Sequence, residues 1–108
     1  MNSFSVNDTD SAGALPLNTI RDNPALKRYE LDVPGGVAFI SYLRKPGVVM
    51  LLHAEVPREL RGRGYGAQVT RATLDLLRTE GVKVAPHCSF VATWMHRHPE
   101  YRDMLSRP

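Results

Sequence analysis

The sequence predicts a single α/β domain with a mixed, mostly antiparallel sheet in β-β-β-α-β-α order, and three observations support this fold class. Segments with strand-like patterns in the first half are separated by the short turn sequences VPGG at 33–36 and KPG at 45–47. A helix-like pattern then separates two strand candidates, and a second helix-like pattern lies near the end. Short turns join antiparallel neighbours, whereas a strand after a crossover helix is expected to lie parallel to the strand before it.

The 108 residues fit one domain. Residues 1–22 are rich in Ser, Asn, Asp and Thr without any period, so we expect a flexible tail followed by a domain over 23–108. The first strand is expected over 27–33, where polar and apolar residues alternate. A second is expected over 37–44, apolar on both faces and therefore central, and a third over 48–56. Pro57 has no N–H to donate and ends the third strand, so 58–65 is expected to be a loop.

Helices are expected over 66–80 and 89–98, separated by a short strand over 82–85. Gly81 follows the first helix, where a left-handed residue is favoured. Ser89 is the expected N-cap of the second helix, and Pro99 its stop. Apolar residues at helical spacing predict the buried faces, which are Val69, Ala72, Thr73, Leu76 and Leu77 in the first helix and Phe90, Val91, Trp94 and Met95 in the second.

The charge distribution favours an anionic partner. The net charge is +3, the first twenty residues contain no Lys or Arg, and positive charge gathers from Arg58 onward. This suits a phosphate-bearing small molecule or a nucleic acid. The single cysteine, Cys88, excludes an internal disulfide. No apolar run reaches the length of a membrane span, and the first residues do not resemble a signal peptide, so we expect a cytoplasmic protein.

The segment ELRGRGYGAQV at 59–69 joins the third strand to the first helix. The first N–H groups of a helix have no internal partner and carry the positive end of its dipole. Glycines allow an anion to approach these groups closely, and the arginines add charge, so a pyrophosphate fits best. The segment contains no Lys for a P-loop, and its G-x-G-x-G spacing departs from the G-x-G-x-x-G dinucleotide motif.

This segment resembles the R/Q-x-x-G-x-G/A acetyl-CoA loop of the GNAT superfamily of N-acetyltransferases. Further segments, HAEVP at 53–57, VAPHCSFV at 84–91 and RHPEY at 97–101, resemble in order the small stand-alone GNAT-like domains. The resemblance spans the chain from about Tyr29 to its end. It implies a GNAT-like fold, acetyl-CoA as the cofactor and an amine acceptor that the sequence leaves unspecified.

The resemblance also implies the residues that bind the cofactor. The backbone around Glu55 and Val56 is expected to pair with the pantetheine arm, between parallel strands that splay apart to admit it. The amides of the glycine segment are expected to bind the pyrophosphate, and these belong to Arg61, Gly62, Arg63, Gly64, Tyr65, Gly66 and Ala67.

Transfer of an acetyl group to an amine requires a group that takes a proton. His53 and Glu55 are two residues apart on a predicted strand, so both are expected on one face, together with Val49 and Leu51. Either side chain can serve as the base, and a polar strand end that meets solvent is the alternative interpretation. Two roles fit Cys88. It can act as a nucleophile that accepts the acetyl group, or it can be a small residue that packs beside the cofactor.

Other functions are weighed against transfer. A metal site is not expected, because His96 and His98 diverge on a helix, as do His87 and Cys88 on an extended segment. A non-catalytic module that binds acyl-CoA or CoA is the alternative to an enzyme. A basic RNA-binding domain is disfavoured, because the aromatic residues follow core spacing and do not interleave with the basic ones.

Overall fold

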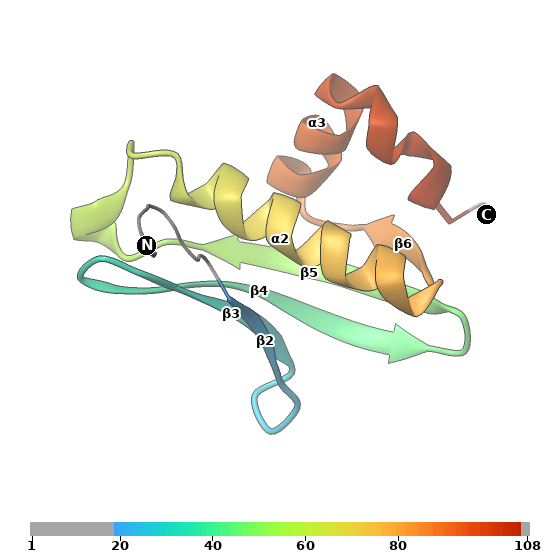
Figure 1. The fold of residues 1–108 in the computed structure, drawn as a ribbon, viewed down its shortest axis with the longest axis horizontal. Coiled ribbons are helices and arrows are strands. Elements are labelled where there is room, and N and C mark those ends of the chain that lie inside the picture. Colours follow the sequence, from blue (N-terminus) through green and yellow to red (C-terminus); the bar gives the residue numbers. More distant parts are fainter. Residues whose placement is uncertain (1–18, 107–108) are drawn as a thin grey trace, which may run out of the picture.

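The computed structural model describes residues 19–106, which form one mixed sheet with helices packed against it (Figure 1). Within this range the sheet has five strands in the order β2-β3-β4-β5-β6. The elements, in chain order, are β2 (Ile20–Asn23), β3 (Arg28–Val33), β4 (Gly36–Lys45), β5 (Val48–Glu55), the 3₁₀ turn η1 (Arg58–Leu60), α2 (Tyr65–Glu80), β6 (Lys83–Pro86), α3 (Ser89–Arg97) and the 3₁₀ turn η2 (Pro99–Met104).

The strand pairing confirms the predicted fold class. Strands β3, β4 and β5 form an antiparallel meander, and β6 pairs with β5 in parallel. Each tight turn has a proline followed by a glycine at positive φ, with Gly35 at 92° and Gly47 at 74°. Positive φ is accessible to glycine at little cost, so these turn sequences fix where each strand reverses.

Strand β2 was not predicted, and it begins within the segment interpreted as a tail. The tail boundary at residue 22 falls inside this strand, and residues 1–18 lie outside the described range. Polar contacts hold β2 to β3, because Arg21 and Asn23 both donate hydrogen bonds to the buried carboxylate of Glu30, at 3.2 and 3.0 Å. A short strand that depends on polar cross-strand pairs lacks the alternation of apolar and polar residues from which strands are predicted.

An irregularity in β5 changes which face its last residues occupy. Ser41 pairs with His53 and Tyr42 pairs with Leu51, so Leu52 is an extra residue in β5, a β-bulge. One extra residue reverses the alternation of side chains between the two faces. His53 and Glu55 therefore lie on the face opposite Val49 and Leu51, and the prediction that these four residues share one face is wrong.

The core lies between the sheet and α2. Helix α2 begins after Gly64, ends at Gly81 with φ of 74°, and packs across all five strands. Its fully buried residues are Val69, Thr70, Thr73, Leu74 and Leu77, so Ala72 and Leu76 of the predicted face are only half-buried. Helix α3 contacts α2, β5 and β6. Within the described range, no helix is long and apolar enough to span a membrane.

Two predictions for α3 are wrong. Cys88, rather than Ser89, occupies the N-cap position, and its side chain makes no capping hydrogen bond. Val91, Trp94 and Met95 are buried as predicted, but Phe90 is 46% exposed. Because a helix has one buried face of limited width, a residue at its edge can face either the core or a neighbouring cleft.

Two buried threonines of α2 differ in hydrogen bonding. Thr70 Oγ1 donates to the Gly66 carbonyl at 2.8 Å, whereas Thr73 Oγ1 has no hydrogen-bond partner among the described residues. We expect Thr73→Val to raise the free energy of unfolding by about 1 kcal/mol, because it removes an unsatisfied buried hydroxyl at nearly constant volume. Urea denaturation followed by circular dichroism measures the change.

Thr70→Val is the matched control, because it removes a satisfied hydroxyl from the same helix. We expect it to lower the free energy of unfolding by about 1 kcal/mol. A Thr73→Val protein that is less stable than the parent would contradict this interpretation of the core.

Candidate functional site

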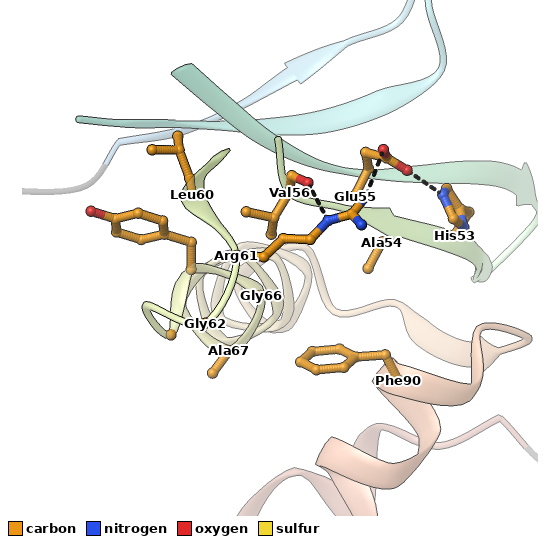
Figure 2. A pocket seen from close by; sticks show the side chains of 12 residues that line it. His53, Ala54, Glu55, Val56, Leu60, Arg61, Gly62, Gly66, Ala67 and Phe90 are labelled. Carbon is orange, nitrogen blue, oxygen red and sulfur yellow. Dashed lines mark hydrogen bonds and ion pairs between the residues drawn. The ribbon is translucent and has the colours of Figure 1, made fainter. Parts of the chain in front are cut away.

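A cleft of about 550 Å³ opens between the end of β5 and the start of α2 (Figure 2). This volume is typical of a site for a small molecule. The lining comes from β5, η1, the glycine segment and α3, and consists of His53, Ala54, Glu55, Val56, Leu60, Arg61, Gly62, Gly64, Tyr65, Gly66, Ala67 and Phe90.

The parting of β5 from β6 forms one side of this cleft. Pairing between the two strands ends at Leu51 and Pro86. The Leu51 carbonyl accepts hydrogen bonds from the N–H groups of both His87 and Cys88, at 2.9 and 3.0 Å. Strand β5 continues to Glu55 without a β6 partner, so its edge beyond Leu51 is open on that side.

The glycine segment forms the opposite side of the cleft. Gly62 and Gly64 have φ of 81° and 84°, and a Cβ on either would meet no atom within 4 Å. Positive φ explains why glycine is used here, and the open space around both positions leaves the backbone accessible. Gly66 serves another purpose, because a Cβ there would lie 3.0 Å from the Phe90 ring.

The N-terminus of α2 faces the cleft without a capping side chain or an acidic residue in its first turn. The first intrahelical bond at this end runs from the Gln68 N–H to the Gly64 carbonyl, at 3.1 Å. The amides of Tyr65, Gly66 and Ala67 precede that bond, so they have no acceptor within the helix. Together with the helix dipole, these donors provide a site for an anion.

Leu60 anchors the loop before this helix. Its side chain is buried and packs against the β3–β4 turn, where a Cβ on Gly35 or Gly36 would lie 3.3 Å from it. The two glycines of the VPGG turn therefore leave room for Leu60. This contact ties the glycine segment to the sheet and fixes its position.

Arg61 crosses the cleft between the loop and β5 (Figure 2). Its Nε donates a hydrogen bond to the Val56 carbonyl at 3.1 Å, and its guanidinium lies 3.7 Å from Glu55 Oε2. Arg63 is exposed, does not line the cleft, and makes no ion pair with a described residue. Arg61 thus links the glycine segment to the end of β5, while Arg63 is available to a ligand.

His53 and Glu55 form a pair at the cleft. His53 Nε2 lies 2.7 Å from Glu55 Oε1, and the side chains are 62% and 40% exposed. The hydrogen bond with His53 holds the pKa of the Glu55 carboxyl below its ordinary value, and the charge of Arg61 adds to this effect. Glu55 therefore remains ionised at neutral pH, and its carboxylate holds the His53 ring through this contact.

Cys88 lies at the end of the open gap, but it is not among the residues that line the cleft. It is half-buried and packs against the hydrophobic core. This position favours the packing role, and a nucleophilic role stays a prediction. Within residues 19–106, no three His, Cys, Asp or Glu side chains form a group that could hold a metal ion.

The structure adds Ala54, Leu60 and Phe90 to the residues named from sequence. Ala54 and Leu60 are apolar residues next to predicted site residues, and no chemical signal distinguishes them. Phe90 has helical spacing typical of the core, so only the position of α3 against Gly66 reveals it as a cleft residue.

Comparison with known proteins agrees with this arrangement. The chain is similar to a GCN5-like candidate N-acetyltransferase from Staphylococcus aureus, whose solution structure was determined by NMR. That protein is 22% identical, with a TM-score of 0.63 over 83% of this chain and 89% of the other. At this identity the likeness shows the fold, which is GNAT-like.

The family is shown by the sequence match. Residues 28–104 match the family described as GCN5-related N-acetyl-transferase, and this range contains every residue that lines the cleft. The protein therefore belongs to the GCN5-related N-acetyltransferase family, a family of acetyl-transferring enzymes.

Proposed function

We propose that the cleft binds acetyl-CoA and that the protein transfers the acetyl group to an amine acceptor. The observation that supports this best is the uncapped N-terminus of α2, which opens on a cleft that continues along the open edge of β5. An anion-binding end and an edge of free backbone groups together match a ligand that has both a pyrophosphate and an amide-containing arm.

The pyrophosphate is assigned to the glycine segment. The N–H groups from Gly62 to Ala67 supply donors. Gly62 and Gly64 adopt positive φ and have no side chain that could block the approach of an anion to these donors. Arg63 is available to add a charged hydrogen bond. No acidic residue lies in the first turn of α2 to oppose an anion.

The pantetheine arm is assigned to the open edge of β5. Its amide groups are chemically like a peptide, so they can pair with a strand that has lost its neighbour. Arg61 already donates to the Val56 carbonyl. A carbonyl oxygen has two lone pairs, so this bond leaves Val56 able to accept a second one.

The chemistry is assigned to His53, oriented by Glu55. Acetyl-CoA supplies an acetyl thioester. The amine nitrogen forms an amide bond to the acetyl carbon and loses a proton, while the C–S bond of the thioester breaks and CoA leaves as a thiolate that takes up a proton from water. His53 is placed to accept the amine proton, directly or through water, and Glu55 fixes its ring through the 2.7 Å contact. Direct transfer to the amine fits these residues, because the Cys88 thiol is not part of the cleft lining.

A change at Gly64 tests the pyrophosphate assignment. Asn and Asp both tolerate positive φ and both serve as N-caps, so either residue should preserve α2. Only Asp places a negative charge beside the bound anion. We expect Gly64→Asp to bind CoA about tenfold more weakly than Gly64→Asn, as measured by calorimetry.

The contrast between these two variants isolates charge from shape. Matching circular dichroism spectra establish that both proteins are folded. Equal CoA affinities in the two folded variants would contradict the placement of the pyrophosphate at this helix.

Substitution of His53 and of Glu55 at one fixed pH tests the assignment of the base. His53→Gln removes the group that is placed to take the proton from the amine, so it should lower kcat/KM about 100-fold. Glu55→Gln keeps the His53 ring and a hydrogen-bonding partner for it, so its kcat/KM should fall less than that of His53→Gln.

The assay measures release of CoA from acetyl-CoA with a panel of primary amines, which includes a lysine peptide, a peptide N-terminus and a polyamine. A folded His53→Gln protein that keeps the kcat/KM of the parent would exclude His53 as the base. Saturable binding of acetyl-CoA without turnover of any amine would support a non-catalytic module instead.

A further inference from the structure

The guanidinium of Arg61 makes two contacts at the end of β5 (Figure 2). Its Nε donates to the Val56 carbonyl at 3.1 Å, and its Nη2 lies 3.7 Å from Glu55 Oε2. An exposed ion pair alone holds its partners weakly, because two long side chains must be ordered for a small gain. Here the hydrogen bond to Val56 already orders the arginine, so its charge is held beside Glu55.

The two oxygens of the Glu55 carboxylate have different partners. Oε2 faces Arg61, whereas Oε1 lies 2.7 Å from His53 Nε2. The Glu55 side chain is 40% exposed, and Arg61 is the partner of its second oxygen among the described residues. The three side chains therefore form a relay, in which Arg61 holds Glu55 and Glu55 holds the His53 ring.

This relay also determines which nitrogen of the neutral His53 ring carries the proton. The hydrogen bond with His53 and the charge of Arg61 keep the pKa of the Glu55 carboxyl below its ordinary value, and an ionised carboxylate can only accept hydrogen bonds. The proton of the neutral ring therefore lies on Nε2, which donates it to Glu55. Nδ1 makes no hydrogen bond with a described residue, and the His53 side chain is 62% exposed, so this nitrogen is open to an amine.

We propose that Arg61 is a positioning residue for acetyl transfer, because it acts through Glu55 to keep the proton of neutral His53 on Nε2 and Nδ1 free for the amine proton. The inference rests on the proposed function. As the amine nitrogen bonds to the acetyl carbon, its proton passes to Nδ1, and the ionised Glu55 beside Nε2 stabilises the positively charged ring. The ring then releases this proton to water.

The backbone and the side chain of Arg61 thus serve different ends. Its amide belongs to the glycine segment assigned to the pyrophosphate, whereas its side chain reaches back to β5. The segment that binds the cofactor therefore also carries the side chain that orients the base.

Long-range ¹H–¹⁵N NMR spectra of the ligand-free protein test the relay, because the two tautomers of histidine differ in the chemical shifts of their ring nitrogens. Spectra recorded at alkaline pH, with the ring in its neutral form, compare the parent protein with Arg61→Gln and Arg58→Gln. His53→Gln identifies the His53 signals. Arg58 is the matched control, because it lies in η1 before the glycine segment, is exposed and does not line the cleft.

We expect His53 to be protonated on Nε2 in the parent protein and in Arg58→Gln. Arg61→Gln should move its signals toward the tautomer mixture of a histidine in a flexible peptide. A parent ring that carries its proton on Nδ1, or an Arg61→Gln protein with unchanged His53 signals, would overturn the inference. This comparison requires neither cofactor nor turnover.

Steady-state kinetics test the consequence for transfer. Arg61→Gln should lower kcat about tenfold, because the base is less well oriented. Its calorimetric affinity for CoA should stay unchanged, because its backbone amide remains and buried Leu60 still anchors the segment. Arg58→Gln should match the parent protein in both quantities.

Two other kinetic outcomes have different meanings. An Arg61→Gln protein that binds CoA more weakly but keeps the parental kcat would show that this side chain only orders the loop, which overturns the inference. If the parent protein acetylates no amine, the proposed function fails, and the role of Arg61 in transfer fails with it even where the NMR spectra show the relay.

Discussion

The carbonyl of Leu51 is the point on which the cleft depends. It accepts hydrogen bonds from both His87 and Cys88, and pairing between β5 and β6 ends there. Beyond this point the chain of β6 turns into α3, while β5 continues alone to Glu55. The bulge at Leu52 follows at once and turns His53 and Glu55 to the face away from the helices. The same few residues thus open the gap, expose a strand edge and position the His53–Glu55 pair.

The glycine segment completes the site because it combines accessible backbone with fixed position. Buried Leu60 ties it to the β3–β4 turn, and Arg61 ties it to the end of β5. Between these anchors and α2, Gly62 and Gly64 leave the amides uncovered. A binding site that is held in place before the ligand arrives loses less conformational entropy on binding. Arg63, without a carboxylate partner among the described residues, adds a positive charge to this segment that is available to a ligand.

Much of the fold could be predicted from the sequence, because turns and periodicity are local properties. The two proline–glycine turns and the α2 pattern indicated the meander and the crossover.

Strand β2 could not be predicted, since its four residues depend on partners such as Glu30 in the next strand. The bulge at Leu52 is equally invisible, because register is a property of two strands. Phe90 shows the same limit, since its exposure depends on where α3 packs. The glycine segment was singled out from the residues alone, whereas the contacts of Glu55 with His53 and with Arg61 appear only in the structure.

The most direct test of this account is an NMR titration of the ¹⁵N-labelled protein with CoA, which reports on each backbone amide separately. The account predicts saturable one-to-one binding, with the largest chemical shift changes at the amides of 62–67 and 54–56. The amides of β2 and β3 should change little, because these strands lie away from the cleft. An absence of saturable shifts, or shifts concentrated on β2 and β3, would contradict the claim that the open edge of β5 and the start of α2 together form the cofactor site.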